Sequence, residues 1–272
     1  MRAKAERLEG AFDLVRRRRA GALLPYFTAG YPTLEVTAEL LRRTERCGVT
    51  AVELGFPYSD SIADGPTIAS SFQQALRSGL RVADIFATVR AVREEVSLPL
   101  SAMVSYAIVD RVGLQAFVGR AVEAGFDALI IPDLSLEEAP AVADTVRGSG
   151  LDLVMLVAPT SSPDRREHIC NLASGFLYYV SVAGITGVRD RLPDDLGDNV
   201  RELRAHTALP ICVGFGVGSA EQVREVCQVS DGAIVGSAIV RRIASCIDQG
   251  ASGPQIADAV EAFMAELTQG CH

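Results

Sequence analysis

Short β-rich runs alternate with amphipathic segments through almost the whole of this 272-residue chain. Runs rich in branched and aromatic residues favour strands, whereas apolar residues at three- and four-residue spacing favour helices. Strands that alternate with helices pair in parallel, because each helix carries the chain back across the sheet in a right-handed crossover. The predicted strands cover residues 22–27, 50–54, 98–104, 128–131, 151–157, 176–180, 211–213 and 233–235.

Eight such repeats predict a closed (β/α)8 barrel, because an open doubly wound sheet usually stops at about five or six strands. We therefore expect an α/β protein with a single TIM-barrel domain over residues 1–272. Leu8, Phe12 and Val15 recur at helical spacing and predict an extra N-terminal helix before the first strand. Inserted and final helices are expected at 67–77 and 256–267. The other predicted helices cover residues 34–47, 82–96, 114–124, 136–147, 164–172, 200–206 and 220–227.

The composition excludes several classes of chemistry and of partner. Lys4 is the only lysine, so a Schiff base, a pyridoxal phosphate linkage and a P-loop are not expected in the body of the fold. The net charge of -8 argues against a nucleic-acid partner or an anionic membrane surface. Six cysteines without a CxxC pair indicate reduced thiols in a cytoplasmic protein. The charged start predicts no signal peptide, and no apolar run is long enough for a membrane span.

Two glycine-rich loops follow the last two predicted strands, where a (β/α)8 barrel carries its active site. They read GFGVG at residues 214–218 and GS at residues 236–237. Glycine lets backbone N–H groups approach an anion, and a helix that begins near Ser237 adds the positive end of its dipole. The two loops therefore predict a phosphate site, with tight turns alone as the alternative. Ser219 and Gln222 predict a capping box for the helix at 220–227.

Two carboxylates lie at and after the end of the second predicted strand. Glu53 interrupts an apolar run, so it should point into the barrel mouth, where desolvation raises its pKa. Asp64 lies in the following loop, where it can stay solvated and ionised. Carboxylates in unlike environments allow one site to hold both an acid and a base near neutral pH. The alternative for Glu53 is a structural, hydrogen-bonded carboxylate, and for Asp60 in the same loop we favour a capping role.

The remaining polar residues near strand ends narrow the chemistry further. The three histidines fall on predicted helices or at the end of the sequence, so neither a metal triad nor a Ser–His relay is expected. Tyr178 and Tyr179 alternate along the sixth strand, so one of them faces the interior and the other the helices. The glycine-rich loop at 183–187 is a candidate lid over a substrate.

Several of these motifs, in this order and spacing, resemble the tryptophan synthase alpha chain family. The resemblance runs from about residue 2 to residue 242. It rests on PYFTAGYP at 25–32, ELGFPYSD at 53–60, ADGP at 63–66, IPDL at 131–134, GITG at 184–187, GFG at 214–216 and GSAIV at 236–240.

The resemblance implies a retro-aldol cleavage of indole-3-glycerol phosphate to indole and glyceraldehyde 3-phosphate, with no cofactor in this chain. It implies that Glu53 is the principal acid/base group, that Asp64 acts at the indole N–H and that Tyr178 assists. The loop with Gly184 and Thr186 would close as a lid onto Asp64. Implied phosphate-binding residues are Gly187, Phe215, Gly216, Gly236 and Ser237, and implied walls of the indole pocket are Tyr26, Val104, Tyr106 and Ile131.

The resemblance also implies a partner, a beta chain that carries pyridoxal phosphate in an alpha2beta2 heterotetramer. Three partner-facing positions depart from the family's usual pattern. Ser61 and Ser135 replace prolines, and Ile108-Val109 replaces an Asn-containing turn. A stand-alone indole-releasing lyase of the same family is therefore the first alternative. Another phosphate-handling barrel isomerase and a non-catalytic regulatory barrel are further alternatives.

Overall fold

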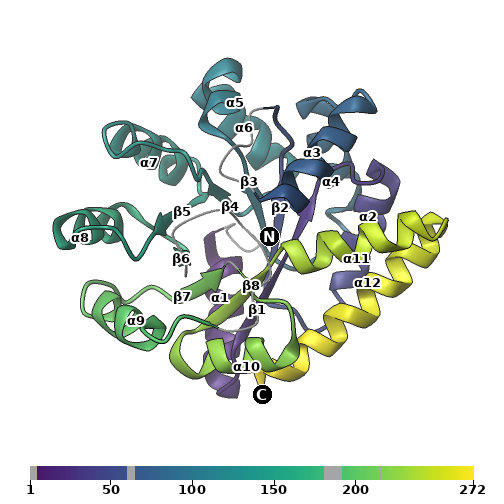
Figure 1. Cartoon of the computed structure of the whole chain (residues 1–272). Coiled ribbons are helices and arrows are strands. Elements are labelled where there is room, and N and C mark those ends of the chain that lie inside the picture. The colour runs from purple at the N-terminus through teal and green to yellow at the C-terminus, as the bar shows by residue number, and fades with distance from the viewer. Residues whose placement is uncertain (1–4, 60–64, 181–191, 215) are drawn as a thin grey trace.

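The computed structural model describes residues 5–59, 65–180, 192–214 and 216–272, and its strands form a closed parallel barrel. Each strand pairs with the next, and β8 pairs with β1. Figure 1 shows the strands at the centre and helices around them. The predicted (β/α)8 barrel is thus confirmed. The strands are β1 (Ala22–Thr28), β2 (Val52–Gly55), β3 (Leu100–Met103), β4 (Ala128–Ile130), β5 (Asp152–Val157), β6 (Leu177–Val180), β7 (Ile211–Gly214) and β8 (Gly232–Val235).

The helices include the two extra elements that the sequence predicts, α1 before β1 and α3 between β2 and β3. None of the described helices combines the length and apolar character needed to cross a lipid bilayer. The helices are α1 (Ala5–Arg18), α2 (Leu34–Thr44), α3 (Pro66–Arg77), α4 (Val82–Val92), α5 (Tyr106–Val112), α6 (Leu114–Ala124), α7 (Ala139–Gly148), α8 (Pro163–Leu172), α9 (Leu196–Arg204), α10 (Ala220–Val229), α11 (Ser237–Asp248) and α12 (Gly253–Thr268), followed by the 3-10 turn η1 (Gln269–Cys271).

One helix, α5, was not expected from the sequence. It begins directly after β3 because Ser105 caps it: the Ser105 hydroxyl accepts the N–H of Ala107 at 3.3 Å. Seven residues are too few for a clear apolar period. The predicted strand at 98–104 is also shorter in the structure, because Pro99 has no N–H to donate to a sheet.

Side chains alternate along the strands between two apolar clusters. The interior cluster fills the barrel, and the helix-side cluster lies between the strands and the helices. Alternation places Val52 and Leu54 of β2 on the helix side and leaves Glu53 between them on the inner face. The interior cluster consists of Leu8, Phe12, Ala22, Leu24, Ala51, Ala128, Ile130, Val154, Phe176, Tyr178, Cys212 and Ile234.

Helix α1 covers one end of the barrel instead of joining the outer ring. Its Leu8 and Phe12 belong to the interior cluster, and the Phe12 ring lies 5.7 Å from the ring of Phe176, the residue before β6. These contacts lie at the amino ends of the strands. The carboxyl ends, where barrels of this class place their active sites, stay clear of α1.

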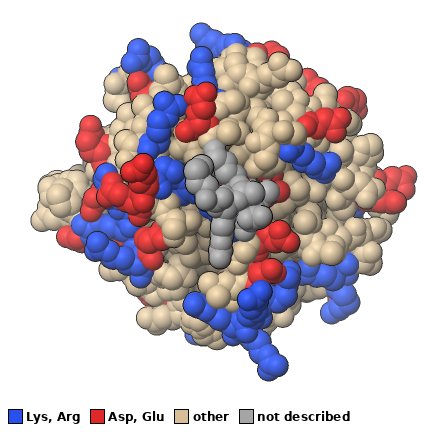
Figure 2. Space-filling view, turned by 180° about the vertical axis from the view of Figure 1, so that it is seen from behind, with Lys and Arg blue, Asp and Glu red and all other residues tan. Residues whose placement is uncertain are grey.

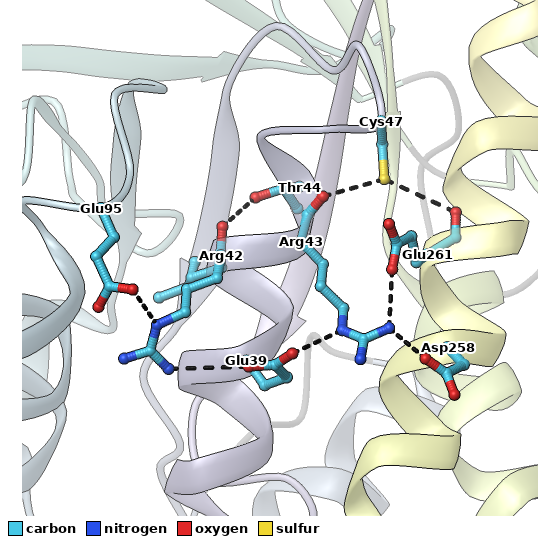
Figure 3. A network of polar contacts seen from close by, with 9 residues as sticks. Glu39, Arg42, Arg43, Thr44, Cys47, Glu95, Asp258 and Glu261 are labelled. Atoms are coloured by element: carbon cyan, nitrogen blue, oxygen red, sulfur yellow. Dashed lines mark hydrogen bonds and ion pairs between the residues drawn. The ribbon is translucent and has the colours of Figure 1, made fainter.

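An ionic network joins α2 to α12 on the outside of the barrel (Figure 3). The Arg43 guanidinium donates to Glu39 on its own helix at 2.8 Å and to Glu261 on α12 at 2.8 Å, and it also pairs with Asp258. Arg42 turns the other way and donates to Glu95 at 2.9 Å. The network holds the last long helix against the helix that follows β1.

Candidate active site

Glu53 lies on the inner face of β2 and is fully buried, with 0% of its surface exposed. Within the part of the chain that the structure describes, neither of its carboxylate oxygens has a hydrogen-bond partner. Burial therefore raises the pKa of Glu53 well above its ordinary value of 4.5. The alternative of a hydrogen-bonded structural carboxylate finds no partner among these residues. A carboxylic acid that is still protonated near neutral pH can act as a proton donor.

Ser101 is the neighbour of Glu53 on β3, and the sequence analysis did not single it out. The two residues are paired in register, so their side chains share the inner face. Ser101 is also 0% exposed, and its hydroxyl has no hydrogen-bond partner within the described ranges. The sequence did carry a signal for Ser101, a polar residue inside an apolar strand. The same kind of signal identified Glu53.

On the other side of Glu53, the register pairs it with Tyr26 of β1. The Tyr26 hydroxyl lies directly over Gly55, where a Cβ atom would overlap it. The Thr28 hydroxyl approaches the Tyr26 hydroxyl at 3.5 Å and shares a 2.7 Å hydrogen bond with Ser71 of α3. The expected pocket residue Tyr26 therefore lies beside Glu53.

Tyr178 is the inward-facing member of the tyrosine pair on β6. It belongs to the interior cluster, whereas Tyr179 belongs to the helix-side cluster, where burial raises its pKa to about 12. The Tyr178 ring extends over the end of β7, and a Cβ atom at Gly214 would overlap its hydroxyl. Glycine at the ends of β2 and β7 thus makes room for the two inward tyrosines.

Two of the expected pocket walls lie one residue out of register with the inner face. On β3 the helix-side cluster contains Leu100 and Ala102, and Val104 continues that parity. Ile131 likewise lies on the helix side, next to the inward-facing Ile130. Met103 and Ile130 have the parity of the inner face, because side chains alternate with a period of two along a strand. The roles of Val104 and Ile131 as pocket walls stay predictions.

Tyr106 is the fourth expected wall of the pocket. It is the first residue of α5, and its hydroxyl interacts with the Glu138 carboxylate; burial and this acidic neighbour raise the pKa of Tyr106. Its backbone N–H donates to Asp133 at 2.7 Å, and the Ser105 hydroxyl donates to the same carboxylate at 2.6 Å. Asp133 therefore anchors the start of α5, and the role of Tyr106 in the pocket stays a prediction.

The expected phosphate loops lie together at the carboxyl ends of β7 and β8. Gly216 has a φ of 91°, which favours glycine, and Ser237 is the buried first residue of α11. The first N–H groups of an α-helix have no partner within it and are available to an anion. The predicted cap of α10 is present, and Gln222 also accepts the N–H of Gly218 at 2.8 Å.

Five of the expected site residues lie outside the described residues: Asp64, Gly184, Thr186, Gly187 and Phe215.

Beside the carboxyl ends of β2, β3 and β4 the described residues form a cleft of about 930 Å³. Its lining includes Pro57, Tyr58, Arg81, Ile108 and Asp133. Figure 2 shows the molecule from behind the view of Figure 1, and on this face the acidic and basic side chains are interspersed.

A buried inward carboxyl group, two inward tyrosines and phosphate-type glycine loops after β7 and β8 define a class of protein, the TIM-barrel enzymes that act on phosphorylated substrates. Comparison with known proteins makes this specific. A sequence model described as tryptophan synthase alpha chain matches residues 12–271.

Two relatives with that name extend over nearly the whole chain. The tryptophan synthase alpha chain of Rhodopirellula baltica is 42% identical over 268 residues, covering 97% of this chain and 96% of the relative. That of Methanosarcina mazei is 41% identical over 270 residues, covering 98% and 95%.

Solved structures agree. A structure of Mycobacterium tuberculosis tryptophan synthase superimposes with a TM-score of 0.87 at 34% identity, covering 97% of this chain and 98% of that one. The Legionella pneumophila alpha chain gives a TM-score of 0.87 at 30% identity, with 97% of each chain covered. This chain belongs to the tryptophan synthase alpha chain family, and it is a lyase of tryptophan biosynthesis that catalyses the alpha reaction.

Proposed function

We propose that this chain cleaves indole-3-glycerol phosphate with Glu53 as its principal acid/base group. The observation that supports this role is the burial of Glu53 without a hydrogen-bond partner at the inner face of the barrel. Its raised pKa suits protonation of the indole carbon, after which the same carboxylate can take the proton of the neighbouring hydroxyl. The carbon–carbon bond then breaks, releasing indole and an aldehyde.

The other site residues receive supporting roles in this proposal. Asp64 would accept a hydrogen bond from the indole N–H, and the inward Tyr178 would assist at the reacting end. Tyr26, Val104, Tyr106 and Ile131 would help to form the walls of the indole pocket, together with the inward-facing Met103 and Ile130. The phosphate would bind at the loops after β7 and β8 through Phe215, Gly216, Gly236 and Ser237, with Gly187 of the loop after β6. Gly184 and Thr186 would lie in the lid over the substrate. No cofactor in this chain takes part.

The experiment that tests this proposal measures indole released from indole-3-glycerol phosphate by the purified chain and its Glu53→Gln variant. The amide keeps the shape of the side chain but does not transfer the proton. We expect turnover to fall about 100-fold or more, with little change in the affinity for inorganic phosphate. Glu95→Gln, which changes an exposed carboxylate on the outer surface, serves as the matched control. A Glu53→Gln variant with near-normal indole release would refute the assigned role.

We also infer that the chain works in the cytoplasm with a beta chain that carries pyridoxal phosphate, in an alpha2beta2 assembly. Related structures support the partner, because two that are similar to this chain are structures of Mycobacterium tuberculosis tryptophan synthase. The stand-alone lyase remains the second candidate, because one of the departures from the family pattern, Ile108, lines the cleft. Ser135 occupies a proline position, where its hydroxyl donates to Glu138 at 2.9 Å.

A further inference from the structure

Two of the six cysteines meet at the amino-terminal side of the barrel. Cys227 lies in the last turn of α10, and Cys271 lies in η1. Their side chains lie close enough to influence each other's ionisation. Both are free thiols in this structure; Cys227 is half-buried and Cys271 is 8% exposed. The two cysteines are thus neighbours, and Cys227 is the more exposed of them.

Backbone contacts hold the two thiols together. The Gly21 N–H donates to the Cys271 carbonyl at 2.7 Å, and a Cβ atom at Gly21 would overlap the Cys227 sulfur. A Cβ atom at Gly270 would overlap the carbonyl oxygen of Ala220, the first residue of α10. Glycine at positions 21 and 270 therefore allows η1 to lie directly against α10. Main-chain packing thus brings the two cysteines side by side.

The two thiols differ in their readiness to react. The interaction with Cys227 lowers the pKa of Cys271, whereas the interaction with Cys271 and burial raise the pKa of Cys227. Since the thiolate is the nucleophile, Cys271 would react first and Cys227 second. Cys47 offers a contrast: it donates to two backbone carbonyl oxygens, and burial raises its pKa to about 11.

We propose that Cys227 and Cys271 form a reversible disulfide when the protein meets hydrogen peroxide. The Cys271 thiolate attacks one peroxide oxygen, the O–O bond breaks, and a sulfenic acid and hydroxide form. The Cys227 sulfur, after losing its proton, attacks the sulfenic sulfur and releases the second hydroxide. The two thiol protons convert both hydroxides to water, so two thiols and one peroxide yield one disulfide and two waters.

The disulfide would close a covalent ring around the last part of the fold. The ring runs from α10 through β8, α11 and α12 to η1, and α12 is itself bound to α2 by the ionic network. The cysteine pair lies near Gly21, just before β1, and so at the amino ends of the strands, whereas the site lies at their carboxyl ends. We therefore expect oxidation to stabilise the fold and to leave the chemistry at the mouth unchanged.

The test treats the full chain with hydrogen peroxide and analyses its peptides without reduction. We expect a linked peptide pair containing residues 227 and 271, with loss of two hydrogen atoms, and a rise in Tm of about 5 °C or more. Dithiothreitol should reverse both changes. Cys227→Ser should stop the reaction at a sulfenic acid on Cys271, which dimedone labels. Cys246→Ser, which removes another half-buried thiol, is the matched control and should oxidise like the parent.

Three results would overturn the proposal. The first is a sulfinic acid on Cys271 with no linked peptide, because a nearby resolving thiol would have intercepted the sulfenic acid. The second is a disulfide between two chains. The third is a linked pair whose formation leaves Tm unchanged or lowers it. None of these readouts depends on indole release, so the proposed reaction and the proposed disulfide fail or succeed separately.

Discussion

At the scale of single residues, the inner face of β2 and β3 carries two polar groups that a purely structural barrel would replace with apolar ones. A buried carboxyl group without a partner destabilises the folded state whenever it is ionised. A buried hydroxyl without a partner also costs free energy. Glu53 and Ser101 are neighbours in register, so both of these destabilising groups lie at one place in the fold. Such a place is typical of an active site.

The raised pKa of Glu53 makes the stability of the fold depend on pH. Above about pH 4.5 the unfolded chain loses the Glu53 proton while the folded protein keeps it, so the folded state binds more protons and stability falls as pH rises toward the folded pKa. The Glu53→Gln variant has no carboxyl group at this position, so its stability does not fall with pH for this reason. The variant should therefore gain stability relative to the parent as pH rises, by up to about 1.4 kcal/mol per pH unit. Urea unfolding between pH 5 and about pH 8 measures the difference, and parallel curves would contradict the raised pKa.

Ser101 and Ser105 are two buried serines, one in β3 and one just after it. We expect their replacement by alanine to have different effects on stability. Ser105 is 5% exposed and donates to Asp133, so Ser105→Ala should lower the free energy of unfolding by about 1–2 kcal/mol. Ser101 has no partner among the described residues, so Ser101→Ala should leave stability unchanged or raise it by up to about 1 kcal/mol. Urea unfolding of both variants distinguishes them. Equal destabilisation would show that Ser101 is hydrogen-bonded in solution.

At the scale of elements, the two arginines of α2 face different partners with different degrees of burial. The Arg43 side chain is 18% exposed and contacts carboxylates on two helices, whereas Arg42 is 37% exposed and bonds mainly to Glu95. Exposed ion pairs contribute little because water and salt screen them. The half-buried, branched network of Arg43 is therefore the one expected to hold α12 on α2 (Figure 3).

Replacing each arginine with methionine, which keeps much of the aliphatic stem, tests this expectation. Arg43→Met should lower the free energy of unfolding by about 1–2 kcal/mol, because it leaves several carboxylates without their common partner. Arg42→Met should cost about 0.5 kcal/mol or less. Denaturant unfolding at low and high salt measures both. An equal loss from the two variants would show that the link between α2 and α12 does not depend on Arg43.

At the scale of the whole molecule, closure of the barrel brings the ends of eight strands into one ring and thereby assembles the site. The same closure sets the cleft beside β2, β3 and β4 next to the mouth, with Ile108 in its lining. A partner that contacts this rim would lie within reach of the loops after these strands. Any coupling between partner binding and catalysis would therefore depend on the closed barrel.

The prediction at the scale of the whole molecule is that the beta chain stimulates indole release. We expect indole release by the isolated chain to be slow and to rise strongly when the cognate beta chain is added, since the partner would contact the rim beside the site. The assay measures indole release by the chain alone, by the chain with the beta chain, and by an Ile108→Asn variant of the chain with the beta chain. Full activity without any partner would favour the stand-alone lyase.

Local sequence patterns determined the eight strands and most of the described helices. They also determined the inward direction of Glu53, the glycine loops after β7 and β8 and the family. These depend on periodicity and on motifs within a few residues. The tertiary structure alone decided that Tyr178 and not Tyr179 faces the interior, and that Met103 and Ile130 rather than Val104 and Ile131 do so. It also brought Cys227 to Cys271 and Arg43 to α12. A period of two leaves the phase of a strand open, and contacts between distant segments exist only once the barrel has closed and packed.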